Sequence, residues 1–135
     1  MAKIDELAIG QEAVLTRTFT QQEVETFAAI SGDANPVHLN ADYAATTVFG
    51  RPIVHGVLTA GLISAVIGMQ LPGLGTIYLN QTLNFKRPVY AGDAITARVS
   101  VTELKPEKGL VMLKTQCFNS AEELVIDGSA VVKVY

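Results

Sequence analysis

Cysteine, tryptophan and charged side chains are all scarce in this sequence of 135 residues. Cys117 is the one cysteine, so the chain can form no internal disulfide and no metal site built from several thiolates. Charged residues make up 17% of the chain and hydrophobic residues 49%. This balance is too apolar for a disordered chain, and it leaves apolar surface for contacts between subunits to cover.

Positive charge is also in deficit, because the formal net charge is -3 at pH 7. Nucleic acids and anionic membranes bind basic surfaces, so we expect neither as a partner. The first six residues, MAKIDE, contain two acids where a secretory signal would carry positive residues before an apolar run. We therefore expect a cytoplasmic protein.

No Asp, Glu, Lys or Arg occurs between Gly56 and Phe85. The helical part of this run, about residues 56–70, is shorter than the ~20 apolar residues that a membrane-spanning helix needs. It is apolar on nearly all sides and ends at Pro72-Gly73, which predicts a helix buried inside protein. The chain has no repeat, linker or low-complexity segment, so we predict a single domain over residues 1–135.

Weaker patterns predict the elements that precede this helix. Residues 13–19 alternate loosely between apolar and polar and predict a strand. Thr20 with Glu23 three residues later forms a capping-box pattern, which predicts a short helix that ends near residues 31–32. Asn40 is a candidate cap for another short helix over residues 41–45.

After Gly73 the apolar pattern changes from a helical to an alternating period. It predicts strands at residues 75–85, 94–104, 110–118 and 124–134. The turns between them are short, which indicates successive hairpins in an antiparallel sheet. A curved antiparallel sheet wrapped around one long buried helix is an α+β fold, and its open edges favour a homodimer.

The residues best suited to chemistry lie between two apolar helices, where residues 31–38 read SGDANPVH. Asp33, Asn35 and His38 fall within six residues, and Pro36 stiffens the segment. A stiff loop that holds an acid and an imidazole meets the geometric needs of proton transfer to a bound substrate. Structural roles also fit: a turn-capping acid, an Asx turn at Asn35, and a buried, hydrogen-bonded histidine.

Three stretches of the chain resemble one protein family. Residues 27–44, which begin FAAISGDANPVH, resemble the signature of the MaoC-like (R)-specific enoyl-CoA hydratases. Residues 51–56 (RPIVHG) and 78–89 (YLNQTLNFKRPV), followed by Gly92-Asp93, are similar to further stretches of that family. The resemblance covers nearly the whole chain and is nearest to short bacterial members that supply (R)-3-hydroxyacyl-CoA for polyhydroxyalkanoate synthesis. It implies a homodimeric hot-dog fold and (R)-specific, reversible hydration of trans-2-enoyl-CoA.

By motif position, the resemblance implies that Asp33 and His38 are the catalytic pair. An unperturbed histidine has a pKa of about 6.5, which suits a base that activates water. Asp33 can hold the same water or protonate C2; as a donor it needs burial beside apolar residues such as Phe27 and Ile30. Gly56, at the start of the buried helix, is the candidate donor to the oxyanion, with tight helix packing as the alternative reason for a glycine.

Other candidates surround the same helix. His55 is expected to buttress the helix start rather than to act directly, and Ser64 either contacts substrate or bonds back to a carbonyl one turn earlier. Lys86 is the first candidate for the phosphates of CoA, followed by Arg87 and Arg51, although each also fits an ordinary solvated position. The expected substrate-binding residues are Asn35, Val54, His55, Leu58, Leu62, Ser64 and Lys86.

Acyl-CoA is the expected partner of the site, and no cofactor beyond the CoA of the substrate is expected. A metal site at Asp33, His38 and His55 is disfavoured because the residues lack a recognisable ligand spacing. The acyl chain is expected along the apolar helix, although many relatives have Met where this chain has Val57, which leaves its length open. The alternative functions are a 3-hydroxyacyl-thioester dehydratase of fatty-acid or polyketide synthesis, an acyl-CoA thioesterase, and a non-catalytic acyl-CoA-binding module.

Overall fold

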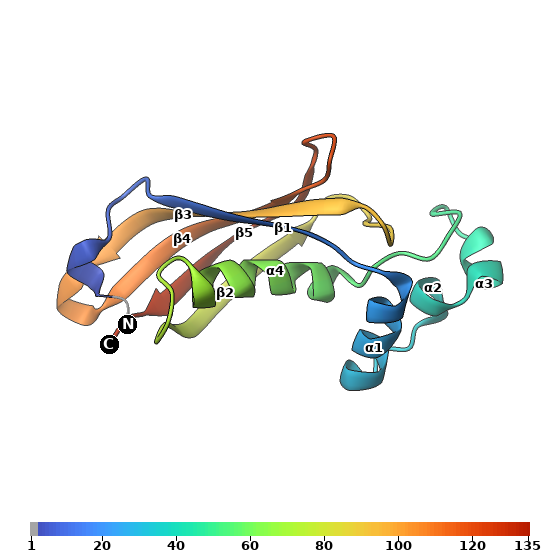
Figure 1. Ribbon diagram of the computed structural model, residues 1–135, viewed down its shortest axis with the longest axis horizontal. Coiled ribbons are helices and arrows are strands. Elements are labelled where there is room, and N and C mark those ends of the chain that lie inside the picture. Colours follow the sequence, from blue (N-terminus) through green and yellow to red (C-terminus); the bar gives the residue numbers. More distant parts are fainter. Residues whose placement is uncertain (1–2) are drawn as a thin grey trace.

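The computed structural model describes residues 3–135 and is organised around one antiparallel sheet. The strands lie in the order β1-β3-β4-β5-β2. Their bounds are β1 (Glu12–Thr18), β2 (Ile77–Phe85), β3 (Ala94–Lys105), β4 (Leu110–Phe118) and β5 (Leu124–Lys133). The long helix α4 (Gly56–Met69) runs along one face of the sheet (Figure 1).

The remaining helices are short. They are η1 (Ile4–Glu6), α1 (Gln21–Ser31), α2 (Pro36–Leu39), α3 (Ala41–Ala45) and η2 (Pro106–Lys108). Figure 1 shows α1, α2 and α3 beyond one end of the sheet, next to the end of α4 where that helix begins. Within residues 3–135, no helix has both the length and the hydropathy needed to cross a membrane.

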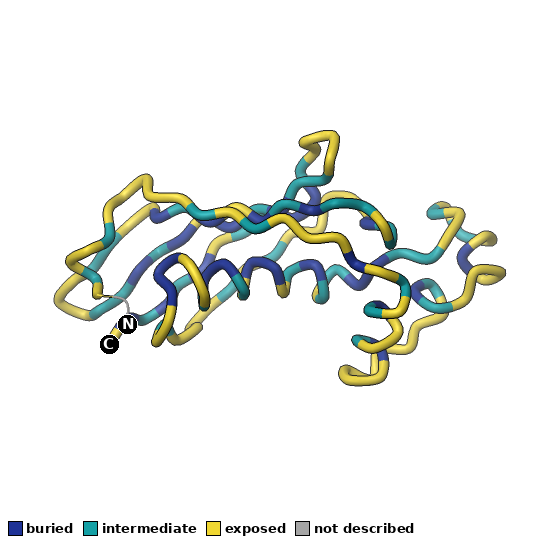
Figure 2. The backbone as a smooth tube through the Cα atoms, in the orientation of Figure 1, coloured by how far each residue is buried: buried dark blue, intermediate teal, exposed yellow. Residues whose placement is uncertain are grey.

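The core lies between α4 and the inner face of the sheet, as Figure 2 shows. Burial alternates along β3 and β4, the period expected of a half-buried sheet. The buried residues on these two strands are Ile95, Ala97, Val99, Val101, Val111, Leu113, Thr115 and Cys117. All of them except Thr115 pack in one cluster with the apolar face of α4, formed by Leu62, Ile63, Val66 and Ile67. Burial raises the pKa of the Cys117 thiol to about 12.

The predicted cap of α1 is confirmed. The Glu23 amide donates to Thr20 Oγ1 at 3.1 Å, and the Thr20 amide donates to Glu23 Oε1 at 3.0 Å. The helix ends at Ser31 and is capped by Gly32, whose φ of 83° is open to glycine with little strain. The Asn40 cap of α3 is also confirmed, since its side chain accepts from the Tyr43 amide at 2.9 Å.

One predicted connection is wrong. Hairpins join β3 to β4 and β4 to β5, but β2 pairs with β5 at the edge of the sheet, so residues 75–85 and 94–104 form no hairpin. Residues 86–93 instead pass beside the start of α4, where the Val54 amide donates to the Val89 carbonyl at 2.7 Å. The amides of Lys86 and Gly92 in this connection donate to the Val125 and Phe19 carbonyls at 2.8 and 2.9 Å, so its bonds reach several segments. This crossing brings Lys86 and Arg87, which follow β2, to the start of the helix.

Candidate active site

A turn followed by a short helix brings Asp33 and His38 together. Asn35 Oδ1 accepts from the Val37 amide at 3.2 Å and caps α2, whose first residue is Pro36. Asp33 Oδ1 accepts from the Asn35 amide at 3.3 Å. The structural roles considered for Asp33 and Asn35 are therefore present. The expectation of a loop as far as His38 is wrong, because proline and the asparagine cap start a helix before it.

The hydrogen bonds of His38 fix which ring nitrogen carries a proton. His38 Nδ1 lies 2.8 Å from the Ile53 carbonyl oxygen. A carbonyl can only accept, so Nδ1 is the donor and the neutral ring has its free lone pair on Nε2. Nε2 in turn lies 4.0 Å from Asp33 Oδ2. The base nitrogen of the histidine therefore faces the carboxylate.

The gap between these two atoms suits an intervening molecule. A direct hydrogen bond would measure about 2.8 Å, whereas two acceptors that share one water stand roughly 4.5 Å apart. The observed 4.0 Å lies nearer the second spacing. The pair can hold one small polar molecule between an acid and an imidazole, which is the arrangement that proton transfer needs.

Asp33 is less buried than the sequence suggested. Its side chain is 52% exposed. Ile30, expected to help bury it, is 79% exposed because it lies on the outer face of α1. The expected apolar enclosure of Asp33 by Phe27 and Ile30 is therefore wrong for the single chain.

His55 supports the segment that carries Asp33 and His38 rather than capping α4. Its Nε2 lies 2.9 Å from the main-chain oxygen of Asp33 and must donate, since a carbonyl accepts. Its ring stacks on His38 with 3.8 Å between centroids and 26° between planes, and Phe27 meets it edge-on at 4.7 Å. The side chain makes no cap hydrogen bond to the helix that follows. The predicted buttressing role is thus directed at the segment that carries Asp33.

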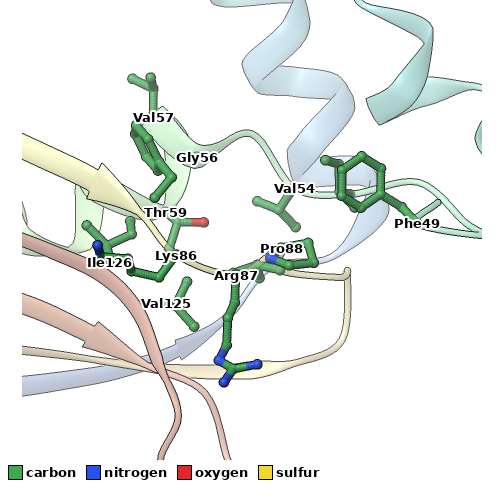
Figure 3. A pocket seen from close by; sticks show the side chains of 13 residues that line it. Phe49, Val54, Gly56, Val57, Thr59, Lys86, Arg87, Pro88, Val125 and Ile126 are labelled. Carbon is green, nitrogen blue, oxygen red and sulfur yellow. The ribbon is translucent and has the colours of Figure 1, made fainter. Parts of the chain in front are cut away.

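A pocket of about 420 Å³ opens beside the start of α4. Figure 3 shows it between the first turn of α4 and the segment that follows β2. The lining residues are Phe49, Ile53, Val54, Gly56, Val57, Thr59, Phe85, Lys86, Arg87, Pro88, Val89, Val125 and Ile126. Asp33 and His38 are not among them, but the segment 53–56, which holds both histidine contacts, forms one wall. The pocket and the Asp33–His38 pair therefore share the segment before α4.

Gly56 is needed for packing. A Cβ at this position would lie 2.6 Å from Cε1 of Phe85, so any side chain here would displace that ring. This contact supports the alternative reason for the glycine, tight packing. The first amides of α4 carry no side-chain cap within the described chain, so they remain able to donate to a ligand. The oxyanion role of Gly56 stays a prediction.

Of the seven expected substrate-binding residues, Asn35 and His55 do not line the pocket, and the structure divides the other five into two groups. Val54 and Lys86 line the pocket. Leu62 is 4% exposed and belongs to the core, and Leu58 packs against that core while remaining partly accessible. Ser64 is exposed on α4 and lies outside the pocket.

Thr59 and Phe85 line the pocket, and the sequence reasoning missed both. Thr59 lies three residues after Gly56, which puts it on the same face of the helix, so helical spacing could have identified it. Its Oγ1 donates to the His55 carbonyl at 3.3 Å. Phe85 ends the predicted strand and gave no such signal, because its contact with Gly56 depends on how β2 pairs.

The basic candidates at the pocket differ in what they contact. Arg87 Nη1 lies 3.2 Å from Glu123 Oε2, and the Arg51 guanidinium lies 4.0 Å from the centroid of the Tyr90 ring. Lys86 lines the pocket and is exposed, and no ion pair of its ammonium group occurs within residues 3–135. Lys86 is the basic group with the most freedom to meet an anionic ligand.

The hydrogen bonds disfavour a metal ion at Asp33, His38 and His55, although one potential ligand atom from each lies within 4.8 Å of the others. Each histidine already donates one nitrogen to a carbonyl oxygen. A metal binds a ring nitrogen in the plane of the ring, and two stacked rings do not direct in-plane lone pairs at one point between them. The cluster is therefore suited to proton transfer rather than to metal binding.

Comparisons with known proteins agree over nearly the whole chain. Residues 6–118 match the MaoC-like domain. The sequence is 51% identical over 128 residues to an (R)-specific enoyl-CoA hydratase of Aeromonas caviae, covering 95% of this chain and 96% of that protein. It is 50% identical over 130 residues to an (R)-specific enoyl-CoA hydratase of Rhodospirillum rubrum, covering 96% and 90%. The structure of an (R)-hydratase from A. caviae involved in PHA biosynthesis matches with a TM-score of 0.93 and 50% identity, covering 96% and 98%.

Proposed function

Because the chain belongs to the MaoC-like domain family, we propose that it hydrates trans-2-enoyl-CoA to (R)-3-hydroxyacyl-CoA in a reversible hydro-lyase reaction. The family resemblance inferred from residues 27–44 is confirmed, and so is the hot-dog fold. The observation that carries the proposal is the pairing of His38 Nε2 with Asp33 Oδ2 across 4.0 Å. Both groups can exchange a proton with a water held between them.

Hydration breaks one O–H bond of water, forms a C3–O bond and places a proton on C2. When Asp33 is ionised and His38 is neutral, both facing atoms are acceptors, so one water can donate a hydrogen to each. Its oxygen is then free to attack C3. The pair takes one proton from the water and returns one to C2, so it ends unchanged. Either residue can make the second transfer, because coupled groups share their protons.

Attack at C3 moves negative charge onto the thioester oxygen. We propose that the Gly56 amide binds this oxygen, since it begins a helix of 14 residues whose dipole favours negative charge at its N-terminus. The pocket beside Gly56 supplies room for the thioester and its pantetheine arm. In this scheme the CoA group belongs to the substrate, and no further cofactor takes part.

Binding contacts are proposed on both sides of the thioester. Val54 in the pocket wall would contact the pantetheine arm, and Lys86 at the rim would contact the CoA phosphates. The acyl chain would follow α4 past Leu58, which is partly accessible, whereas Leu62 is buried in the core and Ser64 is exposed outside the pocket. Acyl-CoA thioesters are made inside cells, so we assign the enzyme to the cytoplasm.

A homodimer is part of the proposal. β2 is an edge strand, and its exposed apolar residues include Ile77 and Leu79. Val57 and Met69, on the first and last turns of α4, are also exposed. A second copy placed against β2 would cover these side chains and satisfy the free strand edge. The molar mass in solution, measured by light scattering after size exclusion, tests this directly.

The activity is tested by adding the protein to crotonyl-CoA and following the loss of the conjugated thioester absorbance. Chiral analysis of the product accompanies the assay. We expect rapid loss and (R)-3-hydroxybutyryl-CoA. Release of free CoA would instead identify a thioesterase, and turnover of carrier-protein thioesters alone would identify a dehydratase of chain synthesis. Binding without any turnover would leave only the binding-module alternative.

A further inference from the structure

We propose that His55 is a positioning residue that holds Asp33 and His38 in the relative positions that proton transfer needs. The inference rests on the proposed hydratase function for its kinetic readout. The sequence suggested support for the start of α4, but the side chain makes no cap bond there. Its polar contact is with the segment that carries Asp33. The residue therefore acts on the acid and on the imidazole rather than on substrate.

Two bonds from one short segment fix the two catalytic residues. The Ile53 carbonyl accepts from His38 Nδ1 at 2.8 Å. Two residues later, His55 Nε2 donates to the main-chain oxygen of Asp33 at 2.9 Å. The residue after His55 is Gly56, which begins α4. Residues 53–56 are thus a common frame that sets Asp33, His38 and the first helix amide relative to one another.

The ring of His55 adds a second constraint. It lies between Phe27, 4.7 Å away and edge-on, and His38, 3.8 Å away and nearly parallel. His38 is free to rotate about its Cβ–Cγ bond only if this stack and its bond to Ile53 both open. The stack therefore adds to the bond from Ile53, which by itself directs His38 Nε2 toward Asp33.

The second nitrogen of His55 argues that the residue does more than fill space. The side chain is 2% exposed, and its Nδ1 has no hydrogen-bond partner among the described residues. A buried acceptor without a partner costs stability. Phenylalanine would fill the same space and stack on the same neighbours without that cost. The advantage of histidine here is the Nε2–H group that holds Asp33.

Two matched variants separate the effect of the His55–Asp33 hydrogen bond from that of the His55–His38 ring stack. His55→Phe retains a ring and removes the donor, whereas His55→Gln places an amide nitrogen near the position of Nε2 and removes the ring. We expect H55F to lower kcat for crotonyl-CoA roughly 10- to 100-fold, as misplacement of a catalytic group does, with KM within about threefold. We expect H55Q to recover most of that loss. The unfolding midpoint of H55F should stay within a few degrees of wild type.

Three results would overturn the inference. These are wild-type kcat in H55F, an equal loss in both variants, or a loss confined to KM. Should H55F fail to fold, long-range ¹H–¹⁵N NMR of the wild-type imidazoles decides the matter. A proton on His55 Nε2 that exchanges slowly with water supports the bond to Asp33, and an unprotonated Nε2 rules it out.

The same experiments distinguish failure of this inference from failure of the proposed function. A wild-type protein that hydrates no enoyl thioester would refute the function, whatever the NMR result for His55. If the wild type is active and H55F has the same kcat, the proposed function stands and the positioning role is refuted.

Discussion

Two regions of this molecule differ in how far their side chains are buried. The body, formed by α4 and the five strands, holds most of the buried hydrophobic cluster. The overhang, residues 20–55, carries α1 to α3 beyond the end of the sheet and is mostly exposed (Figures 1 and 2). The candidate catalytic pair, Asp33 and His38, lies in the overhang, and the pocket lies where the two regions meet.

Hydrogen bonds order the overhang and join it to the segment that follows β2. Within the overhang, Gln21 Nε2 donates to the His38 carbonyl at 2.9 Å, and His55 Nε2 donates to the main-chain oxygen of Asp33 at 2.9 Å. From the segment that follows β2, the Tyr90 hydroxyl donates to the Phe49 carbonyl at 2.9 Å. Burial of apolar surface therefore stabilises the body, while a few directed bonds set the geometry of the site. Activity and stability should respond to different substitutions.

The largest effect is expected from the catalytic pair. Asp33→Asn and His38→Asn should each lower kcat about 10²- to 10⁴-fold, as loss of a general acid or base does. In H38N the amide nitrogen lies near the position of Nδ1 and can still donate to Ile53, so the fold should be retained. Crotonyl-CoA kinetics and thermal unfolding on the same samples measure both quantities.

A different outcome for H38N would show that the two regions form one folding unit. If H38N lost its rate and its unfolding temperature together, the overhang would be part of the folding core and not a separately attached element. Near-normal turnover in either variant would remove that residue from the mechanism.

In the body we expect the reverse result, in which a substitution lowers stability and leaves activity nearly unchanged. Ile63, on α4, is fully buried against the sheet. Ile63→Ala should lower the free energy of unfolding by about 2–5 kcal/mol, the usual cost of a large-to-small change in a core. Urea denaturation measures the loss, and kcat of the folded fraction should change little. A large fall in kcat at full folding would show that core packing also sets the site geometry.

Local patterns were enough to predict most elements of the body and the family of the chain. Alternation predicted β3 and β4 because each strand buries one face, and the capping box predicted where α1 begins. The charge-free run predicted α4 to within one residue. The motif containing Asp33 and His38 led to the correct family, because those residues and their spacing form its signature.

What the sequence did not reveal depends on contacts between distant segments. The pairing of β2 with β5 follows from how residues 86–93 pass the start of α4, and no local period encodes that path. The ring of Phe85 against Gly56 and the bond from His55 to Asp33 join positions 29 and 22 residues apart. The exposure of Ile30 depends on which side of α1 faces the body.

A smaller effect is expected where the overhang begins. Thr20→Ala removes the cap of α1 and should cost about 1 kcal/mol of stability. Thr26→Ala in the same helix is the matched control, because it removes an exposed side chain that only bonds back to the Gln22 carbonyl. Chemical denaturation of both variants measures the difference. Equal stability of the two would mean that the cap does not hold α1 and that contacts with the body do.

The smallest effect is expected at the boundary between the two regions. Lys86→Ala should raise KM for crotonyl-CoA about two- to fivefold with kcat unchanged, because an exposed charge contributes at most ~1 kcal/mol to binding. Added salt should reduce the difference from wild type by screening the CoA phosphates. Steady-state kinetics at two ionic strengths measure both changes.

The substrate itself supplies the control for this assignment. A crotonyl thioester of N-acetylcysteamine keeps the reacting atoms and lacks every phosphate, so K86A and wild type should turn it over with the same KM. Lys114→Ala, on the exposed face of β4, should leave KM unchanged for both substrates. If K86A weakened the phosphate-free thioester equally, Lys86 would act on the pocket wall through Phe85, and the phosphates would have to bind elsewhere on the rim.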